Sequence, residues 1–204
     1  FSKTSPHRLS LDMTGVEELI LNDDLEELIL LGEITKDCKI KAYDSGANLL
    51  LQPDKTIPKL QGLKDLGKLH FMDITELDIE KILTEYPKLR ELRLWGKPGN
   101  LLHFNKLAEF KELEVLTTMD LFGFTAEDIP RPDSLPNLHR FWMNSLPEDA
   151  AKVAKKLYKK RKGEGLDLWI TKPRKPEWLA QNLDNPFRSW DGQENITPAN
   201  AKKA

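Results

Sequence analysis

One pattern restricts the fold of this 204-residue chain more than any other: a nine-residue motif with apolar residues at fixed positions, which occurs five times. The copies are LGKLHFMDI (66–74), LRELRLWGK (89–97), LEVLTTMDL (113–121), LHRFWMNSL (138–146) and GLDLWITKP (165–173). Their sixth positions are residues 71, 94, 118, 143 and 170, so the steps between copies are 23, 24, 25 and 27 residues. One unit of this length cannot bury its own apolar face, so the pattern predicts units that stack around a shared core.

Within each copy, the apolar residues alternate with other residues. Phe141 and Met143 have the spacing of two side chains on one face of a β-strand, and Trp142 between them belongs to the opposite face. Each copy therefore predicts one short strand, with its fourth and sixth residues directed toward the core. The pattern also places a tryptophan on the face opposite the core, which calls for an explanation in a soluble chain.

The spacing L-x-x-L-x-L resembles the leucine-rich repeat, and the resemblance covers residues 66–170. It implies an α/β solenoid, or horseshoe, with short parallel strands on the concave side and helices and loops on the convex side. The chain departs from the family three residues after the last strand leucine, where an Asn or Cys usually bonds neighbouring backbones. That position here holds Ile74, Lys97, Leu121, Leu146 and Pro173. We therefore expect the turns after the strands to satisfy their backbone groups in another way.

The segments that return from one strand to the next have different helical signals. Apolar residues at helical spacing predict a helix within 74–89, at most two turns within 103–110, a proline-rich loop or single turn within 125–136, and a long helix within 145–165. Ser145 and Glu148 have the spacing of a capping box at the start of the long helix, and Gly163 and Gly165 are expected to end it.

Residues that alternate with the core-facing positions form two columns across the predicted sheet, because equivalent positions on neighbouring strands lie about 4.8 Å apart. The first column is His70, Arg93, Thr117, Trp142 and Trp169, and the second is Met72, Trp95, Met119, Asn144 and Thr171. Trp, Arg and Met are enriched at protein interfaces. The predicted binding residues are His70, Met72, Arg93, Trp95, Thr117, Met119, Trp142, Asn144 and Trp169, with the tryptophans and Arg93 as anchors.

The two ends are predicted to flank the repeats of residues 63–172. Residues 1–62 are expected to cap the stack, with a short helix at 25–32, two strands around a turn within 38–53, and an additional degenerate repeat starting near Leu49 and Leu51. Residues 173–204 are expected to form a C-terminal cap and tail, whose segment PEWLAQNLDNPFRSWDG is rich in apolar residues. Two alternatives follow for the tryptophans: they form an open binding surface, or the tail covers them.

The chain has none of the motifs that carry common enzyme chemistry. It lacks G-x-G-x-x-G, G-x-x-x-x-G-K-[ST], H-E-x-x-H and G-x-S-x-G, and its four histidines have no metal-ligand spacing. No apolar run approaches 18 residues, so we expect no membrane span. The single cysteine, Cys38, fits a reducing cytoplasm. These features predict a cytoplasmic, non-enzymatic protein without a cofactor or metal.

The leading hypothesis is an interaction module that binds an unidentified protein or peptide on the concave face. One alternative is contact with an anion or nucleic acid through the basic helix 150–162, because residues 152–175 hold ten Lys or Arg against two acids. The absence of interleaved aromatic residues and the formal net charge of −2 argue against nucleic acid. A third hypothesis is a structural scaffold for a neighbouring domain. The sequence leaves the oligomeric state open.

Overall fold

The fold is known from a computed structural model, which describes residues 8–21, 25–32, 34, 38–42, 49–53 and 65–172. All of these residues belong to one compact unit, Phe1–Pro173. The turn expected between the two strands within 38–53, at residues 44–46, and the predicted C-terminal cap and tail at 173–204 lie outside the described residues.

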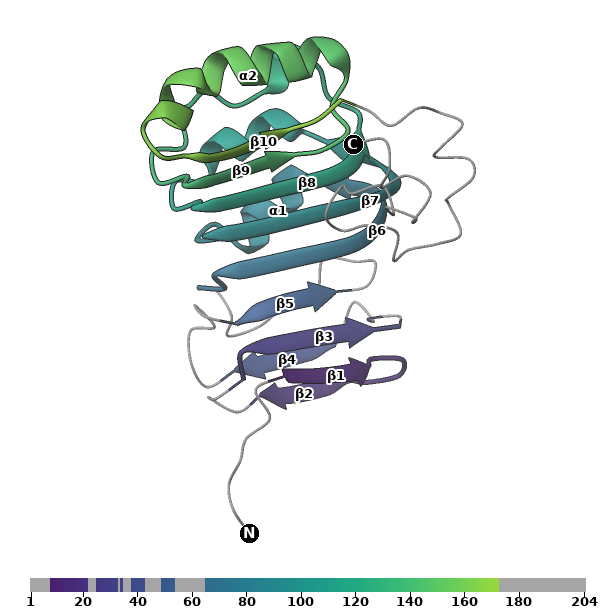
Figure 1. Cartoon of the computed structure of the whole chain (residues 1–204). Helices are drawn as coiled ribbons and strands as arrows, with labels where there is room; N and C mark the ends of the chain where they lie inside the picture. Colours follow the sequence, from purple (N-terminus) through teal and green to yellow (C-terminus); the bar gives the residue numbers. More distant parts are fainter. Residues whose placement is uncertain are drawn as a thin grey trace, which may run out of the picture. The chain divides into compact units, whose positions relative to one another are not determined.

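An eight-stranded sheet organises this unit, and all its strand pairs are parallel (Figure 1). From one edge to the other it contains β1 (Arg8–Asp12), β3 (Glu27–Leu31), β5 (Leu50–Pro53), β6 (Lys68–Asp78), β7 (Glu91–Leu102), β8 (Val115–Phe122), β9 (Arg140–Met143) and β10 (Asp167–Ile170). A second sheet pairs β2 (Glu18–Leu21) with β4 (Lys39–Ala42), also in parallel. The predicted α/β class with parallel strands is therefore confirmed.

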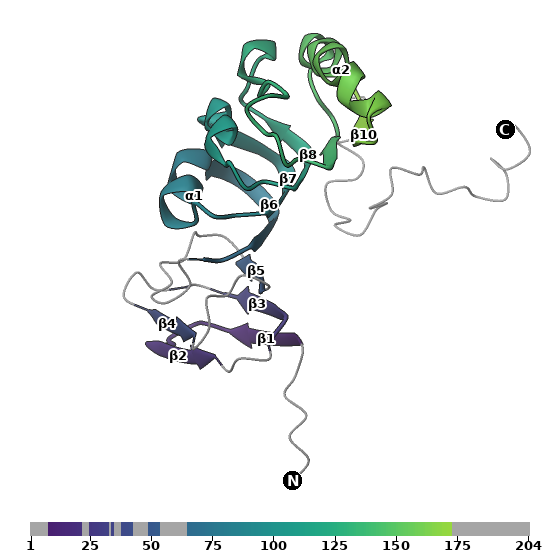
Figure 2. The same ribbon diagram turned by 90° about the vertical axis from the view of Figure 1, so that its left-hand side faces the viewer.

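The helices lie on one side of the main sheet. They are α1 (Ile79–Glu85), the 3₁₀ turns η1 (Phe104–Glu109) and η2 (Ala126–Asp128), and α2 (Glu148–Gly163). Figure 2 shows α1 and the β2–β4 pair on the same side of the main sheet. The Tyr158 ring on α2 lies 4.4 Å from the ring of Phe141 on β9, so α2 also packs on the core side. Each predicted returning segment thus has the expected kind of structure, with α2 the longest helix.

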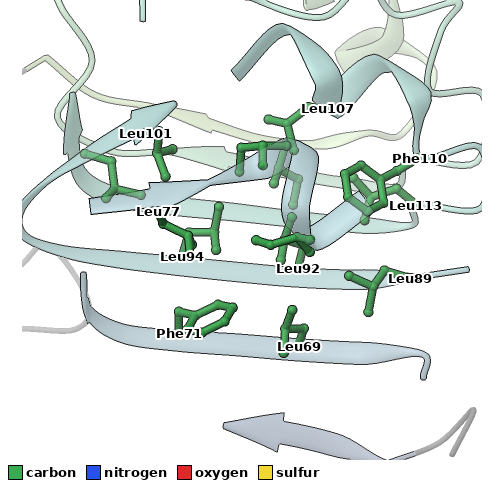
Figure 3. Packing of buried hydrophobic residues seen from close by; sticks show 14 of the residues in the cluster. Leu69, Phe71, Leu77, Leu89, Leu92, Leu94, Leu101, Leu107, Phe110 and Leu113 are labelled. Atoms are coloured by element: carbon green, nitrogen blue, oxygen red, sulfur yellow. The ribbon is translucent and has the colours of Figure 1, made fainter. Parts of the chain in front are cut away.

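The core is built from rows of apolar side chains that continue from strand to strand. One row, read off the strand register, is Leu9, Leu28, Leu51, Leu69, Leu92, Leu116, Phe141 and Leu168. Figure 3 shows leucines of β6 and β7 packed with residues of the returning segments. All labelled residues in this view, such as Leu94 and Phe110, are buried. Burial on this scale is the main favourable contribution to folding, at about 25 cal/mol per Å² of apolar surface.

The sheet extends into the region that the sequence predicted to be an N-terminal flank. β5 pairs with β6, β3 with β5 and β1 with β3, so these strands continue a core row of β6. The helix predicted at 25–32 is wrong, because residues 27–31 form β3, where Leu28 and Leu30 are buried and alternate with more exposed residues. Pairing on both sides, with β1 and β5, outweighs the weak local preference for helix in this short segment.

The turns after the strands share a left-handed residue. Gly32, Asp73, Asp120 and Ser145 stand two residues after core-facing positions and have φ between 51° and 75°. The following apolar residues, Ile74, Leu121 and Leu146, are buried. Buried apolar residues thus occupy the position where the leucine-rich-repeat pattern usually has Asn, and the polar groups lie one residue earlier.

Ser145 illustrates how the turns are satisfied. Its hydroxyl donates a hydrogen bond to the Asp120 carboxylate, and its backbone N–H donates to Thr171 Oγ1 at 3.1 Å. The predicted capping box of Ser145 and Glu148 is therefore wrong. Pro147 holds the N-cap position of α2, without a side-chain cap, because the Ser145 side chain already bonds the neighbouring repeat.

Candidate binding face of the parallel sheet

The face of the main sheet opposite the core, which we call the outer face, carries the predicted binding residues. The strand register joins His70 to Arg93, Arg93 to Thr117, Thr117 to Trp142 and Trp142 to Trp169. The first predicted column therefore exists as one row across β6, β7, β8, β9 and β10. In the second column, Trp95 and Met119 are also register partners.

Two tryptophans stand side by side at the β9–β10 end of this row, and we call them the tryptophan pair. The rings of Trp142 and Trp169 are 5.6 Å apart between centroids and are inclined by 63°, which is an edge-to-face arrangement. Trp169 is 41% exposed, whereas Trp142 is half-buried. The pair thus presents one accessible ring supported by a second ring behind it.

A charged pair holds the tryptophan pair in place. The guanidinium carbon of Arg140 lies 4.8 Å from the centroid of a Trp142 ring, and Arg140 Nε is 2.9 Å from Asp167 Oδ2. The pKa of the Asp167 carboxyl is lowered, because the Trp142 indole N–H faces it and because Arg140 donates to it. The indole N–H faces the carboxylate without full hydrogen-bond geometry to any partner among the described residues. Cation–π contacts of this kind contribute about 0.5–1 kcal/mol at exposed sites.

Three of the predicted binding residues are buried on the outer face, so the expectation that they are accessible is wrong. His70 is 3% exposed, Trp95 is 7% exposed and Thr117 is 8% exposed. The rings of His70 and Trp95 meet edge to face, with centroids 4.0 Å apart. Strands only about 4.8 Å apart bring large side chains of one face into contact, so they cover one another.

Burial also affects the charge of His70. Its pKa falls to about 4, first because the imidazole is removed from water and second because the Arg93 guanidinium is near. His70 is therefore neutral at pH 7 and contributes packing on the outer face instead of a positive charge.

The remaining predicted residues are half-buried. The positions next to the buried Trp95 on the outer face are held by Met72, Met119 and Arg93. Arg93 Nε is 2.6 Å from Glu91 Oε1. Asn144 Oδ1 accepts a hydrogen bond of 3.3 Å from Thr171 Oγ1, so this amide belongs to the turn network. Trp169 of the tryptophan pair is therefore the most accessible residue of the predicted set.

Several charges on the outer face are paired near the starts of the strands. Arg8 Nε is 3.1 Å from Glu27 Oε2, and this pair, like Arg140–Asp167, joins the first residues of two neighbouring strands, whereas Arg93 pairs with Glu91 within β7. The outer face thus presents aromatic and aliphatic surface between ion pairs that are already satisfied. Such a surface suits a largely uncharged partner.

Sequence reasoning missed Arg140 and Asp167. Each stands two residues before a tryptophan, so the alternation that identified Trp142 and Trp169 also places these two residues on the outer face. The alternation of side chains along each strand therefore contained this information. Following it from each tryptophan two residues toward the start of its strand identifies both Arg140 and Asp167.

The basic helix has a different geometry from the one that the sequence suggested. Lys152, Lys155, Lys156, Lys159, Lys160 and Lys162 are exposed on α2. Arg161 is instead turned onto the loop of residues 132–138, where its guanidinium donates to the carbonyl oxygens of Pro132 at 3.1 Å, Leu135 at 2.9 Å and Pro136 at 3.2 Å. Arg161 therefore holds the loop in place, and its guanidinium does not belong to the basic surface that the sequence suggested for an anion.

Other kinds of site have less support among the residues that the structure describes. No group of three or more His, Cys, Asp or Glu suited to a metal ion occurs there. The Cys38 thiol is buried, and this burial raises its pKa, which lowers its reactivity at neutral pH. Within the described ranges, no helix has the length and apolar character needed to cross a membrane.

No protein-family model, no curated protein and no solved structure matches this chain. Its class is therefore defined by the fold and the outer face: an α/β protein whose parallel sheet has one face in the core and the other lined with aromatic and paired charged residues.

Proposed function

We propose that this chain is a leucine-rich-repeat solenoid with irregular repeats, and that it is a non-enzymatic, cytoplasmic interaction module. In this proposal the outer face is the concave side of the solenoid, and it binds a protein or peptide. The tryptophan pair is the main anchor, and Met72, Met119 and Arg93 extend the contact surface toward β6. His70, Trp95 and Thr117 support this surface from below.

The observation that carries the proposal is the exposed ring of Trp169 next to Trp142, on the face that does not contribute to the core. Tryptophan on a rigid sheet offers a large contact area at a low cost in conformational entropy. Binding energy at interfaces concentrates in a few Trp, Tyr and Arg residues, each costing about 2 kcal/mol or more when truncated. The Arg140–Asp167 pair fixes the rings before a partner arrives, which reduces the ordering cost of binding.

Two further observations support a binding role over catalysis. The ion pairs of the outer face are satisfied within the face, so they do not leave a free acid and base facing each other. His70, which lies on the same face, is buried and neutral at pH 7. The scaffold hypothesis predicts instead that the tryptophan pair has no specific ligand.

The experiment selects ligands from a random peptide display library against the wild-type chain and then measures binding of the enriched peptides by titration. We expect Trp169→Ala to weaken binding at least about tenfold, as expected for loss of an interface anchor. Ile20→Ala is the matched control, because Ile20 is 52% exposed but lies on β2, outside the main sheet.

Thermal unfolding followed by circular dichroism separates binding from folding. Trp169→Ala should leave the melting temperature near that of the wild type, because its ring is already partly in water. Acrylamide should quench a substantial part of the tryptophan fluorescence in the free wild-type protein. Shielded tryptophans, together with a large loss of stability in Trp169→Ala, would show that the ring is part of a packed core and would reject the proposed anchor.

A further inference from the structure

The solvent-facing side of α2 carries a continuous group of positive charges, and we call it the lysine surface. It consists of Lys152, Lys155, Lys156, Lys159, Lys160 and Lys162, all exposed. No acidic residue occurs between Asp149 and Glu164. At a rise of about 1.5 Å per residue, these lysines extend along roughly 15 Å of helix.

Only the two ends of the lysine surface are neutralised. Lys152 Nζ is 3.2 Å from Glu148 Oε1, and Lys160 Nζ is 3.7 Å from Glu164 Oε1. Lys155, Lys156, Lys159 and Lys162 make no ion pair with any of the described residues. Four neighbouring ammonium groups that repel one another and lack a counter-charge favour an anionic partner, because such a partner relieves the repulsion.

The other residues of α2 show what kind of anionic partner fits. Ala150, Ala151, Ala154 and Tyr158 are buried in the core, and Val153 and Leu157 are half-buried. The helix therefore has no exposed apolar side chain to insert into a lipid interface, which is the usual feature of membrane-bound amphipathic helices. A flat anionic surface laid along α2 would also meet the negative charges of Glu148 and Asp149 at one end and of Glu164 at the other, and these would repel it.

A rod-shaped polyanion that crosses the helix meets only the lysines in its middle. The phosphate backbone of a nucleic-acid duplex has this shape and the highest common density of negative charge, about one charge per 1.7 Å of axis. Lysine contacts phosphate as a point charge. Arg161 is the only arginine of α2, and its planar guanidinium already donates hydrogen bonds to carbonyl oxygens of the loop. The surface thus lacks groups suited to reading bases.

We propose that the lysine surface of α2 binds the phosphate backbone of a nucleic-acid duplex, without sequence preference. The near-neutral charge of the whole chain does not oppose this contact, because the potential at a surface depends on the local charges within about 8–10 Å at physiological salt. This site is separate from the outer face, and its occupancy does not depend on the proposed protein or peptide ligand.

The test is fluorescence anisotropy with two labelled DNA duplexes of unrelated sequence. We expect both to bind with equal affinity at about 50 mM salt, and the affinity to fall with a log–log slope of roughly −3 to −4, as for about four phosphate contacts. Lys155→Glu/Lys156→Glu/Lys159→Glu should weaken binding at least about tenfold, since it reverses three of the charges that carry the contact.

The matched control is Lys155→Arg/Lys156→Arg/Lys159→Arg, which keeps the charges and should bind as the wild type does. Trp169→Ala should also bind DNA normally, so failure of this inference and failure of the proposed peptide site are distinguishable. Circular dichroism checks that each variant is folded. No binding at about 50 mM salt, equal binding by the charge-reversed variant, or binding to vesicles rich in phosphatidylserine in preference to the duplexes would overturn the proposal.

Discussion

The hydroxyl of Ser145 donates a hydrogen bond to the carboxylate of Asp120, and so joins the turns of two neighbouring repeats. Both residues have left-handed backbones, with φ of 66° at Ser145 and 51° at Asp120. Ser145 is 3% exposed, so the bond forms in a largely dry environment. The pair therefore ties Asp120 of β8 to the turn after β9.

The left-handed backbone of Ser145 predicts that glycine is tolerated better than alanine at this position. Ser145→Ala removes the donor and keeps the Cβ in a left-handed residue, so we expect the lost hydrogen bond to lower the free energy of unfolding by about 1–3 kcal/mol. Ser145→Gly removes the same donor but tolerates φ of 66°, so it should be more stable than Ser145→Ala by about 1 kcal/mol. Urea denaturation measures both. An alanine variant at least as stable as the glycine variant would contradict the assigned backbone conformation.

The core register predicts the effect of a charge at Leu94. This residue is 0% exposed and stands between Phe71 and Thr118 in adjacent strands. Leu94→Asp should abolish cooperative folding, because burying an unpaired charge costs more than about 4 kcal/mol out of a typical total of about 5–15 kcal/mol. Leu94→Met keeps the volume and should cost less than about 1.5 kcal/mol. Thermal melts followed by circular dichroism distinguish the two, and a native-like melt for Leu94→Asp would refute the register.

The lowered pKa of His70 predicts a pH-dependent stability. The folded-state pKa of about 4 lies below the ordinary value of 6.5, so the unfolded chain takes up the proton first as the pH falls. Stability should therefore be complete above pH 6.5 and should fall by about 3 kcal/mol between pH 6.5 and about 4.

The control for this effect is His70→Phe, which keeps a ring against Trp95 and cannot titrate. The difference in unfolding free energy between wild type and variant should change with pH in that window. The raised pKa of His103, caused by its bond to Asp78, contributes with the opposite sign but is common to both proteins. A constant difference from neutral pH down to pH 4 would show that His70 is accessible to protons in the folded state.

The position of Arg161 predicts that it cannot be replaced by lysine. Its guanidinium bonds several carbonyl oxygens of the loop 132–138 at once, which a single ammonium group cannot reproduce. Arg161→Lys should lower the free energy of unfolding by about 1–3 kcal/mol, because carbonyl oxygens that are partly buried lose their donors. Lys160→Ala, next to it but exposed, should change stability by less than about 0.5 kcal/mol. Equal effects of the two substitutions in urea denaturation would show that the loop does not depend on the guanidinium.

The sequence by itself determined which residues of β6, β7, β8, β9 and β10 share a face, because alternation along a strand is a local property of the backbone. The recurrence of the motif also determined that these strands lie in register, since only stacking buries the leucines of successive copies. The helical periods likewise predicted α1 and α2, with α2 the longest element among the returning segments.

Only the tertiary structure decided how exposed each residue is and which polar partner it finds. Trp95 and Trp169 both alternate with core-facing residues in the sequence, yet Trp95 is buried beside His70 and Trp169 is exposed on the edge strand β10. Ser145 bonds Asp120 of the preceding repeat, and Arg161 bonds the loop before α2. Each partner comes from a residue about 25 positions away, and the local periods that predict strands and helices contain no information on contacts at that separation.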